Sequence, residues 1–155
     1  MLDSLFSEIE AEGVEVRRHS FKSSNLKGLY TDGVITLNMP AIENQAELVC
    51  VLAEELGHHH TSYGNILDQK CLQKRKQERL AMNWAHRRLV PLISFISAFE
   101  AGVRNRHEFA DLIGVTEKFL DNSIQYYLDK YGLCLPYDEK YIICFDPVGV
   151  IKLFD

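Results

Sequence analysis

The sequence predicts an α+β fold: a small N-terminal antiparallel sheet packed on a helical body, followed by a C-terminal helix pair and a short β-hairpin. Three observations lead to this prediction. β-rich runs fill much of the first 40 residues, helical periodicity dominates from about residue 42 to 132, and the last 15 residues are again β-rich. The length of 155 residues suits one domain over 1–155 with its own core.

The N-terminal third begins with a helix and continues into strands. Apolar residues at helical spacing predict a helix over 2–11, which Gly13 ends. Alternating residues predict a strand within 14–21. The stretch 28–40 predicts a hairpin, because Asp32-Gly33 between two β-rich runs suits a type I′ turn.

The helical body should contain three long helices and a pair. We expect helices, in chain order, over about 43–60, 68–89 and 91–102, and two more within 106–132. Gly114 and Val115 should join the pair, with Thr116 as N-cap of its second helix. A terminal hairpin is expected around residues 146–149.

Composition excludes several classes of protein. The net charge of -5 argues against a general nucleic-acid binder, and no apolar run is long enough to span a membrane. The acidic, amphipathic start lacks the features of a signal peptide, so we expect a cytoplasmic protein. The four cysteines of the chain are scattered and form no C-x-x-C pair. We expect all of them to be buried, reduced thiols: Cys50, Cys71, Cys134 and Cys144.

The stretch AEELGHHH, residues 53–60, carries the most distinctive chemistry. Glu54 and His58 are four residues apart, so on a helix they share one face and can coordinate one metal ion. Glu55 would then lie beside the attacking water and take its proton. A carboxylate is an acceptable zinc ligand, although imidazole is commoner at this position, and such a mixed site also tolerates manganese or iron.

Two other interpretations of this stretch stay open. Glu55 and His59 are also four apart, but they point towards the Leu52 and Leu56 face, which core packing should occupy. Alternatively the stretch is an ordinary polar helix end, where histidines are mildly favourable.

Two linked stretches resemble the ImmA/IrrE family of metallopeptidases. LAEELGHHHTS stands where that family has His-Glu-x-Gly-His, and QERLAMNWAHRRLVP resembles the family's following helix, E-x-x-A-x-x-[FW]-A-x-x-L-[LMV]-x-P. Arg88 departs from this pattern, and the resemblance covers about residues 15–133. The helix pair resembles relatives from Gram-positive bacteria and their mobile elements. The matching residues of the second stretch are Glu78, Ala81, Trp84, Ala85, Leu89 and Pro91.

The resemblance implies the residues of a site. Glu55 would be the general base, with His58 and Glu78 as metal ligands and Glu54 in place of the family's first His. A divalent metal is implied, zinc first, with manganese and iron as alternatives. Within the single domain we expect a catalytic core over 15–92, a helical partner-recognition part over 93–133 and a β tail over 134–155.

For other residues near this site, the sequence leaves two interpretations open or gives only a weak expectation. His59 either faces the core or orients a ligand from behind it, His60 is expected to face solvent, and Tyr63 is either an oxyanion donor or merely packed. The edge of the strand 33–38 either holds an extended peptide by strand addition or is ordinary sheet.

The family resemblance implies a hydrolase that cleaves a helix-turn-helix repressor of a phage or mobile element. The alternative is a catalytically impaired binding module with the same fold, which regulates a repressor or acts in a toxin–antitoxin pair. Direct nucleic-acid binding is not expected, because the second helix of the pair is mixed to acidic. Membrane binding is not expected, because no apolar run is long enough for a membrane span. A run of basic residues either meets an acidic partner or nucleic acid, or is the solvated face of a helix: Lys70, Lys74, Arg75, Lys76, Arg79, Arg87 and Arg88.

Overall fold

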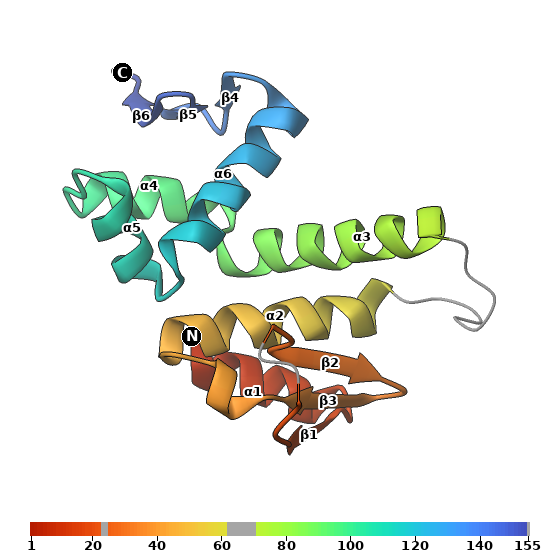
Figure 1. Cartoon of the computed structure of the whole chain (residues 1–155). Helices are drawn as coiled ribbons and strands as arrows, with labels where there is room; N and C mark the ends of the chain where they lie inside the picture. The colour runs from red at the N-terminus through yellow and green to blue at the C-terminus, as the bar shows by residue number, and fades with distance from the viewer. Residues whose placement is uncertain (23–24, 62–70, 155) are drawn as a thin grey trace. The chain divides into compact units, whose positions relative to one another are not determined.

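A computed structural model describes residues 1–22, 25–61 and 71–154, and its elements follow the predicted α+β order (Figure 1). The chain divides into two units, residues 1–85 and 86–155, with the boundary inside one long helix. The division into core, partner-recognition part and tail within one domain stays a prediction. Among the described residues, no helix combines the length and apolar character needed to cross a membrane.

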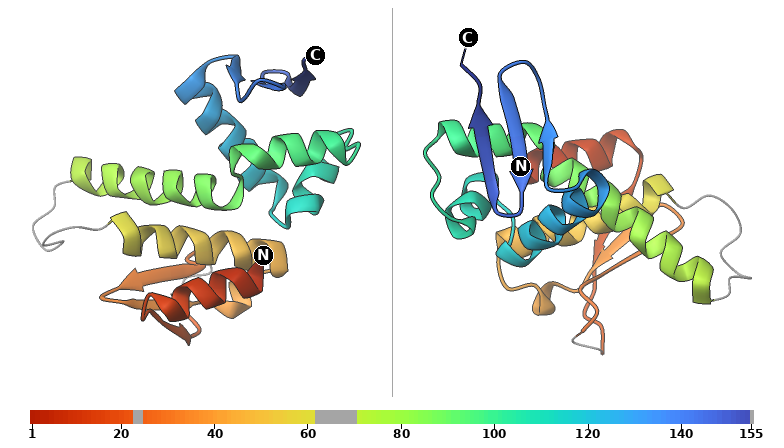
Figure 2. Two further views of the ribbon diagram at one scale, coloured as in Figure 1. Left: turned by 180° about the vertical axis from the view of Figure 1, so that it is seen from behind. Right: turned by 90° about the horizontal axis from the view of Figure 1, so that it is seen from above.

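The first unit is a three-stranded sheet with helix α2 on it. Its elements are α1 (Leu2–Ala11), β1 (Glu15–Arg18), β2 (Gly28–Thr31), β3 (Val34–Leu37), the short 3-10 helix η1 (Met39–Ala41), α2 (Gln45–Thr61) and the part of α3 (Cys71–Leu89) that ends at Ala85. Helix α2 contacts β2, β3 and α1, and it lies along the sheet in every view (Figure 2). The core between them consists of fully buried aliphatic side chains, among them Leu5, Ile9, Ile35, Leu37, Leu52 and Leu56.

The sheet is mixed, with strand order β1-β3-β2. The β2–β3 hairpin is antiparallel as predicted, and its turn residues Asp32 and Gly33 have φ angles of 46° and 79°, as a type I′ turn requires. Strand β1 instead runs parallel to β3. Alternation of apolar residues specifies the two faces of a strand but not its direction, so the expectation of a wholly antiparallel sheet was wrong for β1. Because β3 is central, it offers no free edge, and of the two alternatives for 33–38 the structure agrees with ordinary sheet.

The second unit begins at His86, the last turn of α3, and contains three helices and a second sheet. Its elements are α4 (Leu92–Glu100), α5 (Arg106–Ile113), α6 (Glu117–Tyr131), β4 (Cys134–Pro136), β5 (Tyr141–Phe145) and β6 (Val148–Lys152). The antiparallel sheet, in the order β4-β5-β6, packs on α4 and α6. Its core is a cluster of aromatic rings: Phe95, Phe109, Tyr127 and Phe145.

The junction between α5 and α6 has the expected form. Gly114 is left-handed, with φ 77°, and the side chain of Thr116 accepts a hydrogen bond from the Phe119 N–H as the N-cap of α6. The terminal hairpin of β5 and β6 is also as predicted, whereas β4 was not predicted. Its short Cys-Leu-Pro segment lacks the alternation that marks a longer strand.

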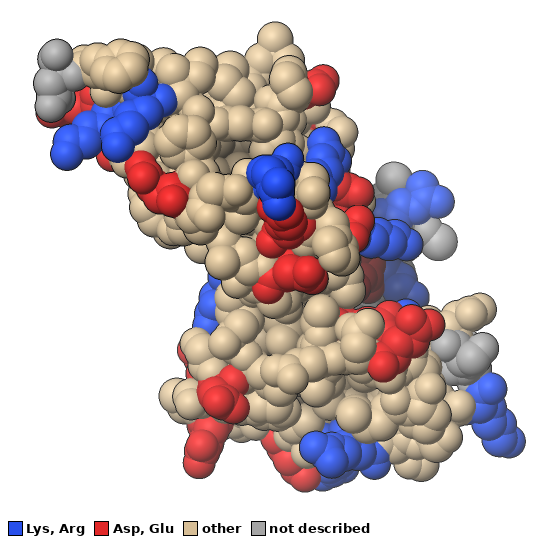
Figure 3. Space-filling view, turned by 90° about the vertical axis from the view of Figure 1, so that its left-hand side faces the viewer, with Lys and Arg blue, Asp and Glu red and all other residues tan. Residues whose placement is uncertain are grey.

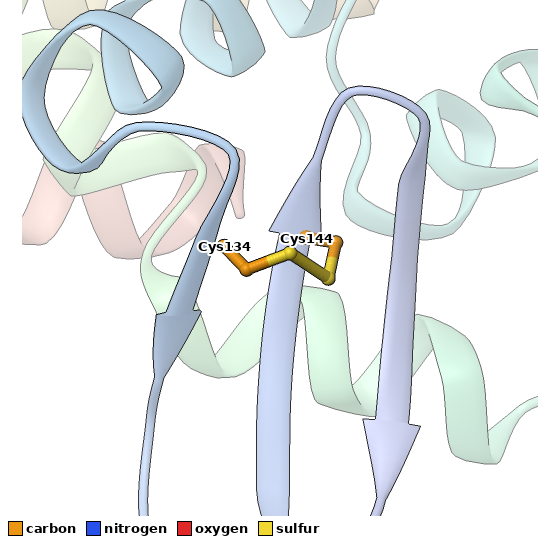
Figure 4. Close-up of a disulfide and its surroundings, with 2 residues drawn as sticks. All are labelled: Cys134 and Cys144. Carbon is orange, nitrogen blue, oxygen red and sulfur yellow. A yellow bond between two sulfur atoms is a disulfide. The ribbon is translucent and has the colours of Figure 1, made fainter.

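The unpredicted strand changes the interpretation of two cysteines. Cys134 on β4 and Cys144 on β5 are cross-strand partners, with Cα atoms 4.1 Å apart, and they form a disulfide (Figure 4). Cys134 is exposed. The expectation of buried, reduced thiols was therefore wrong for this pair. The expectation agrees with Cys50, which is buried and outside any disulfide. The side chain of Cys71 lies outside the described part of the structure.

Buried His86 should make the stability of the second unit depend on pH. The Ser123 hydroxyl donates to the Phe119 carbonyl and lies 2.6 Å from His86 Nδ1, so the neutral ring donates to Ser123. Burial, with a smaller contribution from Arg87, lowers the pKa of His86 to about 4. The unfolded chain therefore takes up this proton near pH 6.5, before the folded chain does, and stability is lost as pH falls from 6.5 towards 4.

His86→Asn removes the titration and keeps a donor towards Ser123. Between pH 7 and pH 4, we expect the parent to lose up to about 3 kcal/mol more free energy of unfolding than the variant. Urea unfolding at both pH values measures this difference. An equal loss in the two proteins would contradict the assignment.

Candidate metal centre

Helix α2 carries two of the candidate ligands on one flank. Leu52 and Leu56 are fully buried in the core, which leaves Glu54 and His58, one turn apart, on the side of the helix that is only partly covered. The buried leucines thus fix this part of α2 against the core. The face of the helix that carries Glu54 and His58 stays partly exposed.

Gly57 brings the third candidate ligand close. A Cβ atom at Gly57 would overlap the carbonyl oxygen of Ala81 and lie 3.2 Å from its Cα atom. Only glycine therefore allows the backbone of α3 to approach α2 at this point. Glu78 lies one turn before Ala81, and this approach places its Oε2 3.2 Å from Nε2 of His58.

The three side chains form one cluster of ligand atoms. Glu54, His58 and Glu78 each offer one atom, and these atoms lie within 4.8 Å of one another. Among the described residues, no other group of three or more His, Cys, Asp and Glu side chains has ligand atoms this close together. Glu54 and His58 are partly buried, whereas Glu78 is exposed, so the cluster faces solvent on one side. The sequence-based candidates therefore come together in space.

The electrostatics of the cluster favour a cation. Burial raises the pKa of Glu54, and the charge of Glu78 raises it further, while His58 lowers it. Burial also raises the pKa of Glu55 to about 8, with further contributions from Glu54 and Glu78. No Lys or Arg among the described residues contributes to either shift. A divalent cation would supply the missing positive charge, so the residues present fit the metal that such a site takes.

Glu55 lies between the cluster and strand β2. Its side chain is almost fully buried, with the residue 8% exposed, and its carboxylate accepts a hydrogen bond from the backbone N–H of Tyr30. A Cβ atom at Gly28 would lie 3.2 Å from Oε1 of Glu55, so the strand passes directly beside this carboxylate. Glu55 thus lies against β2 and is close enough to Glu54 and Glu78 for their charges to raise its pKa, but it is not one of the three ligand residues.

His59 does not complete the alternative site with Glu55. Its Nδ1 lies 2.8 Å from the Tyr30 hydroxyl, and that hydroxyl accepts from the backbone N–H of Gly33. Its Nε2 lies 3.6 Å from a carboxylate oxygen of Glu12, which caps the C-terminal end of α1. The ring therefore bridges the sheet and α1. Glu54 and His58, not Glu55 and His59, form the group with ligand geometry.

The expectation that His60 faces solvent was wrong. Its ring stacks on Trp84 of α3 with centroids 4.6 Å apart, and its Nε2 is buried without a hydrogen bond within the described ranges. The reason is helical geometry, because His60 lies three residues after Gly57, on the flank that α3 approaches. Tyr63 lies outside the described residues.

Two residues of the site were missed from the sequence. Tyr30 contacts Glu55 through its backbone and His59 through its hydroxyl, and Gly28 allows β2 to lie against α2. Both lie more than 20 residues before the motif. No spacing signal links them to it, since only the folded sheet brings β2 beside α2.

Comparison with known proteins identifies the family. Neither a search of curated proteins nor a search of solved structures returned a significant match. A family model described as Peptidase_M78, the IrrE N-terminal-like domain, matches residues 9–125, about three quarters of the chain. That range includes the whole cluster and both helices that form it. The chain therefore belongs to the Peptidase_M78 family and carries an IrrE N-terminal-like, metallopeptidase-like domain.

Proposed function

We propose that this chain is a metal-dependent endopeptidase in which Glu54, His58 and Glu78 hold the metal and Glu55 is the general base. One observation supports this proposal above the others: three ligand atoms converge within 4.8 Å beside a buried fourth carboxylate that is not itself a ligand. Structural metal sites usually close their coordination with a fourth protein ligand, whereas three ligands with an exposed side suit catalysis.

The chemistry follows from the positions of these groups. A bound divalent cation would act as a Lewis acid, polarising the scissile carbonyl and lowering the pKa of water. Glu55 would accept the proton of the attacking water and later deliver it to the leaving amine nitrogen. The Tyr30 N–H holds the carboxylate in position for both transfers. Burial is the main cause of the raised pKa of Glu55, and positive charge at the ligands would offset the smaller contribution from the charges of Glu54 and Glu78.

Strand β2 would hold the substrate. It pairs with β3 on one side and has no strand partner on the other within the described part of the chain. An extended peptide can add to such an edge through main-chain hydrogen bonds. Because β2 passes beside Glu55, a peptide on this edge would bring a backbone amide to the base. This edge would therefore have the role that one of the two alternatives gave to 33–38.

The ligand set predicts how the site would respond to a change of metal. Two carboxylates and one imidazole tolerate zinc, manganese or iron, whereas more imidazole favours zinc. Glu54→His should therefore raise the affinity for zinc relative to manganese by at least about tenfold. Competition titrations with a chromophoric chelator measure both affinities. An unchanged ratio would show that residue 54 does not contact the metal.

We propose a helix-turn-helix repressor of a phage or mobile element as the substrate, in the cytoplasm. Support for this comes from the family resemblance alone.

A second candidate function, a catalytically impaired module that binds a repressor or toxin–antitoxin partner, is favoured by one observation. Glu54 stands where the family has its first His.

One experiment separates the two candidates. Metal-stripped protein, alone or reloaded with zinc or manganese, is incubated with a peptide library made from a bacterial proteome, and new peptide termini are identified by mass spectrometry. The endopeptidase would produce new termini only after reloading. One bound metal per chain without new termini would instead support the impaired module.

A further inference from the structure

Beside the metal cluster, the N-terminal part of α3 is strongly basic and almost fully exposed. In residues 73–80 every side chain is exposed except Gln77, which is partly buried. Glu78 is the one acid of this segment, and four of its residues are basic: Lys74, Arg75, Lys76 and Arg79. We call these four residues the basic segment. It lies in a chain whose overall charge is -5, so it is a local reversal of sign.

Two members of the basic segment lie on the same side of α3 as the metal ligand. Lys74 is four residues before Glu78 and Arg75 is three before it, so both share its face of the helix, one turn away. One helical turn is about 5.4 Å along the axis. A chain bound at the cluster would therefore need to extend by only two residues to reach these cations.

Among the described residues, the four cations of the basic segment form no ion pair. Other cations of this chain pair with carboxylates, such as Arg17 with Glu15 and Arg106 with Asp121. None of the ion pairs within the described ranges includes a member of the basic segment. Elsewhere charges are more mixed, and on the face in Figure 3 Lys and Arg lie scattered among Asp and Glu. With no described carboxylate paired to them, these exposed cations suit an anionic partner.

We propose that the basic segment is a docking site for an acidic stretch of the polypeptide substrate, next to the bond that is cut. This rests on the proposed peptidase function. A peptide fits better than nucleic acid because it can place one or two carboxylates on Lys74 and Arg75 while its neutral backbone passes the carboxylate cluster. A nucleic acid carries a phosphate at every nucleotide, and Glu54, Glu55 and Glu78 would repel it.

A binding assay on the full-length, zinc-loaded chain tests the docking site. Fluorescein-labelled hexaglutamate, hexaglutamine and hexalysine peptides are titrated by anisotropy at 50 mM salt. The parent should bind hexaglutamate most tightly, and the Lys74→Glu/Arg75→Glu variant should bind it at least about fivefold more weakly. The control Lys118→Glu/Lys140→Glu makes the same change in net charge at two exposed lysines of the second unit and should stay within about twofold of the parent.

Two results of this assay would overturn the proposal. Equal weakening in the variant and the control would show that only net charge matters. Labelled duplex DNA that binds the parent more tightly than hexaglutamate at 150 mM salt, and loses binding in the variant, would assign the segment to nucleic acid. A milder variant, Lys74→Gln/Arg75→Gln, repeats the test without adding negative charge near Glu78.

A cleavage assay distinguishes failure of docking from failure of the peptidase function. Library peptides cut by the parent are resynthesised with the same central residues, flanked either by Glu or by Lys. The parent should cut the Glu-flanked form at least about fivefold faster, and the variant should lose this preference. Equal rates would overturn docking and leave the peptidase function intact. If nothing in the library is cut, the hexaglutamate titration alone decides on docking.

Discussion

Glu55→Gln is expected to reduce the rate of peptide cleavage by at least about a thousandfold while leaving metal affinity within about threefold of the parent. The amide has nearly the same shape as the carboxylate, but it cannot accept the proton of water. It can still accept the hydrogen bond from the Tyr30 N–H through its oxygen. Initial rates on a peptide from the library assay and a zinc titration measure the two effects separately.

A matched control on the same helix is Glu47→Gln. Glu47 lies two turns before Glu54, where its carboxylate pairs with Lys27, away from the cluster. The control should keep its activity within about twofold, since a partly exposed ion pair contributes at most about 1 kcal/mol. Cleavage by Glu55→Gln at the parent's rate would show that Glu55 is not the base. Loss of zinc from the same variant would instead make Glu55 a ligand.

Gly57→Ala is expected to destabilise the chain by about 3 kcal/mol and to weaken metal binding by at least about tenfold. The new methyl group would overlap the backbone carbonyl of Ala81, which no rotamer change can move. Helix α3 would have to shift away from α2 and would carry Glu78 away from His58. The change runs against helix propensity, by which alanine alone would stabilise the helix by about 1 kcal/mol.

Gly149→Ala is the control for this substitution. A Cβ atom at Gly149 on β6 meets nothing within 4 Å, and its backbone is not left-handed. It should change the free energy of unfolding by less than about 1 kcal/mol. Urea unfolding and chelator competition are measured for both variants. A Gly57→Ala protein as stable as the parent, with unchanged metal affinity, would contradict the close approach of the two helices.

The elements of the fold were predictable where local chemistry decides them. Helical spacing of leucines marks α2, Asp32-Gly33 marks the hairpin turn, and Gly114 with Thr116 marks the α5–α6 junction. The parallel pairing of β1 was not predictable, because alternation carries no information on strand direction. The disulfide was missed with β4, since Cys134 and Cys144 become neighbours only through that strand.

The candidate site, too, was predictable from the sequence only in part. Glu54 and His58 follow from helical spacing, and Glu78 follows from the family resemblance of the next helix. Their convergence depends on Gly57, whose lack of a side chain is visible in the sequence. The roles of Tyr30 and Gly28 and the stacking of His60 on Trp84 depend on contacts between distant segments. Such contacts leave no periodic signal, so they required the folded chain.

We propose that Glu54, His58 and Glu78 together hold one divalent cation. Diffraction from crystals of the chain grown with zinc, recorded at the zinc absorption edge, tests it most directly. We expect one strong anomalous peak within about 2.3 Å of a carboxylate oxygen of Glu54, a ring nitrogen of His58 and a carboxylate oxygen of Glu78. A peak elsewhere, or Glu54 and Glu78 turned away from His58 in zinc-bound crystals, would contradict the claim.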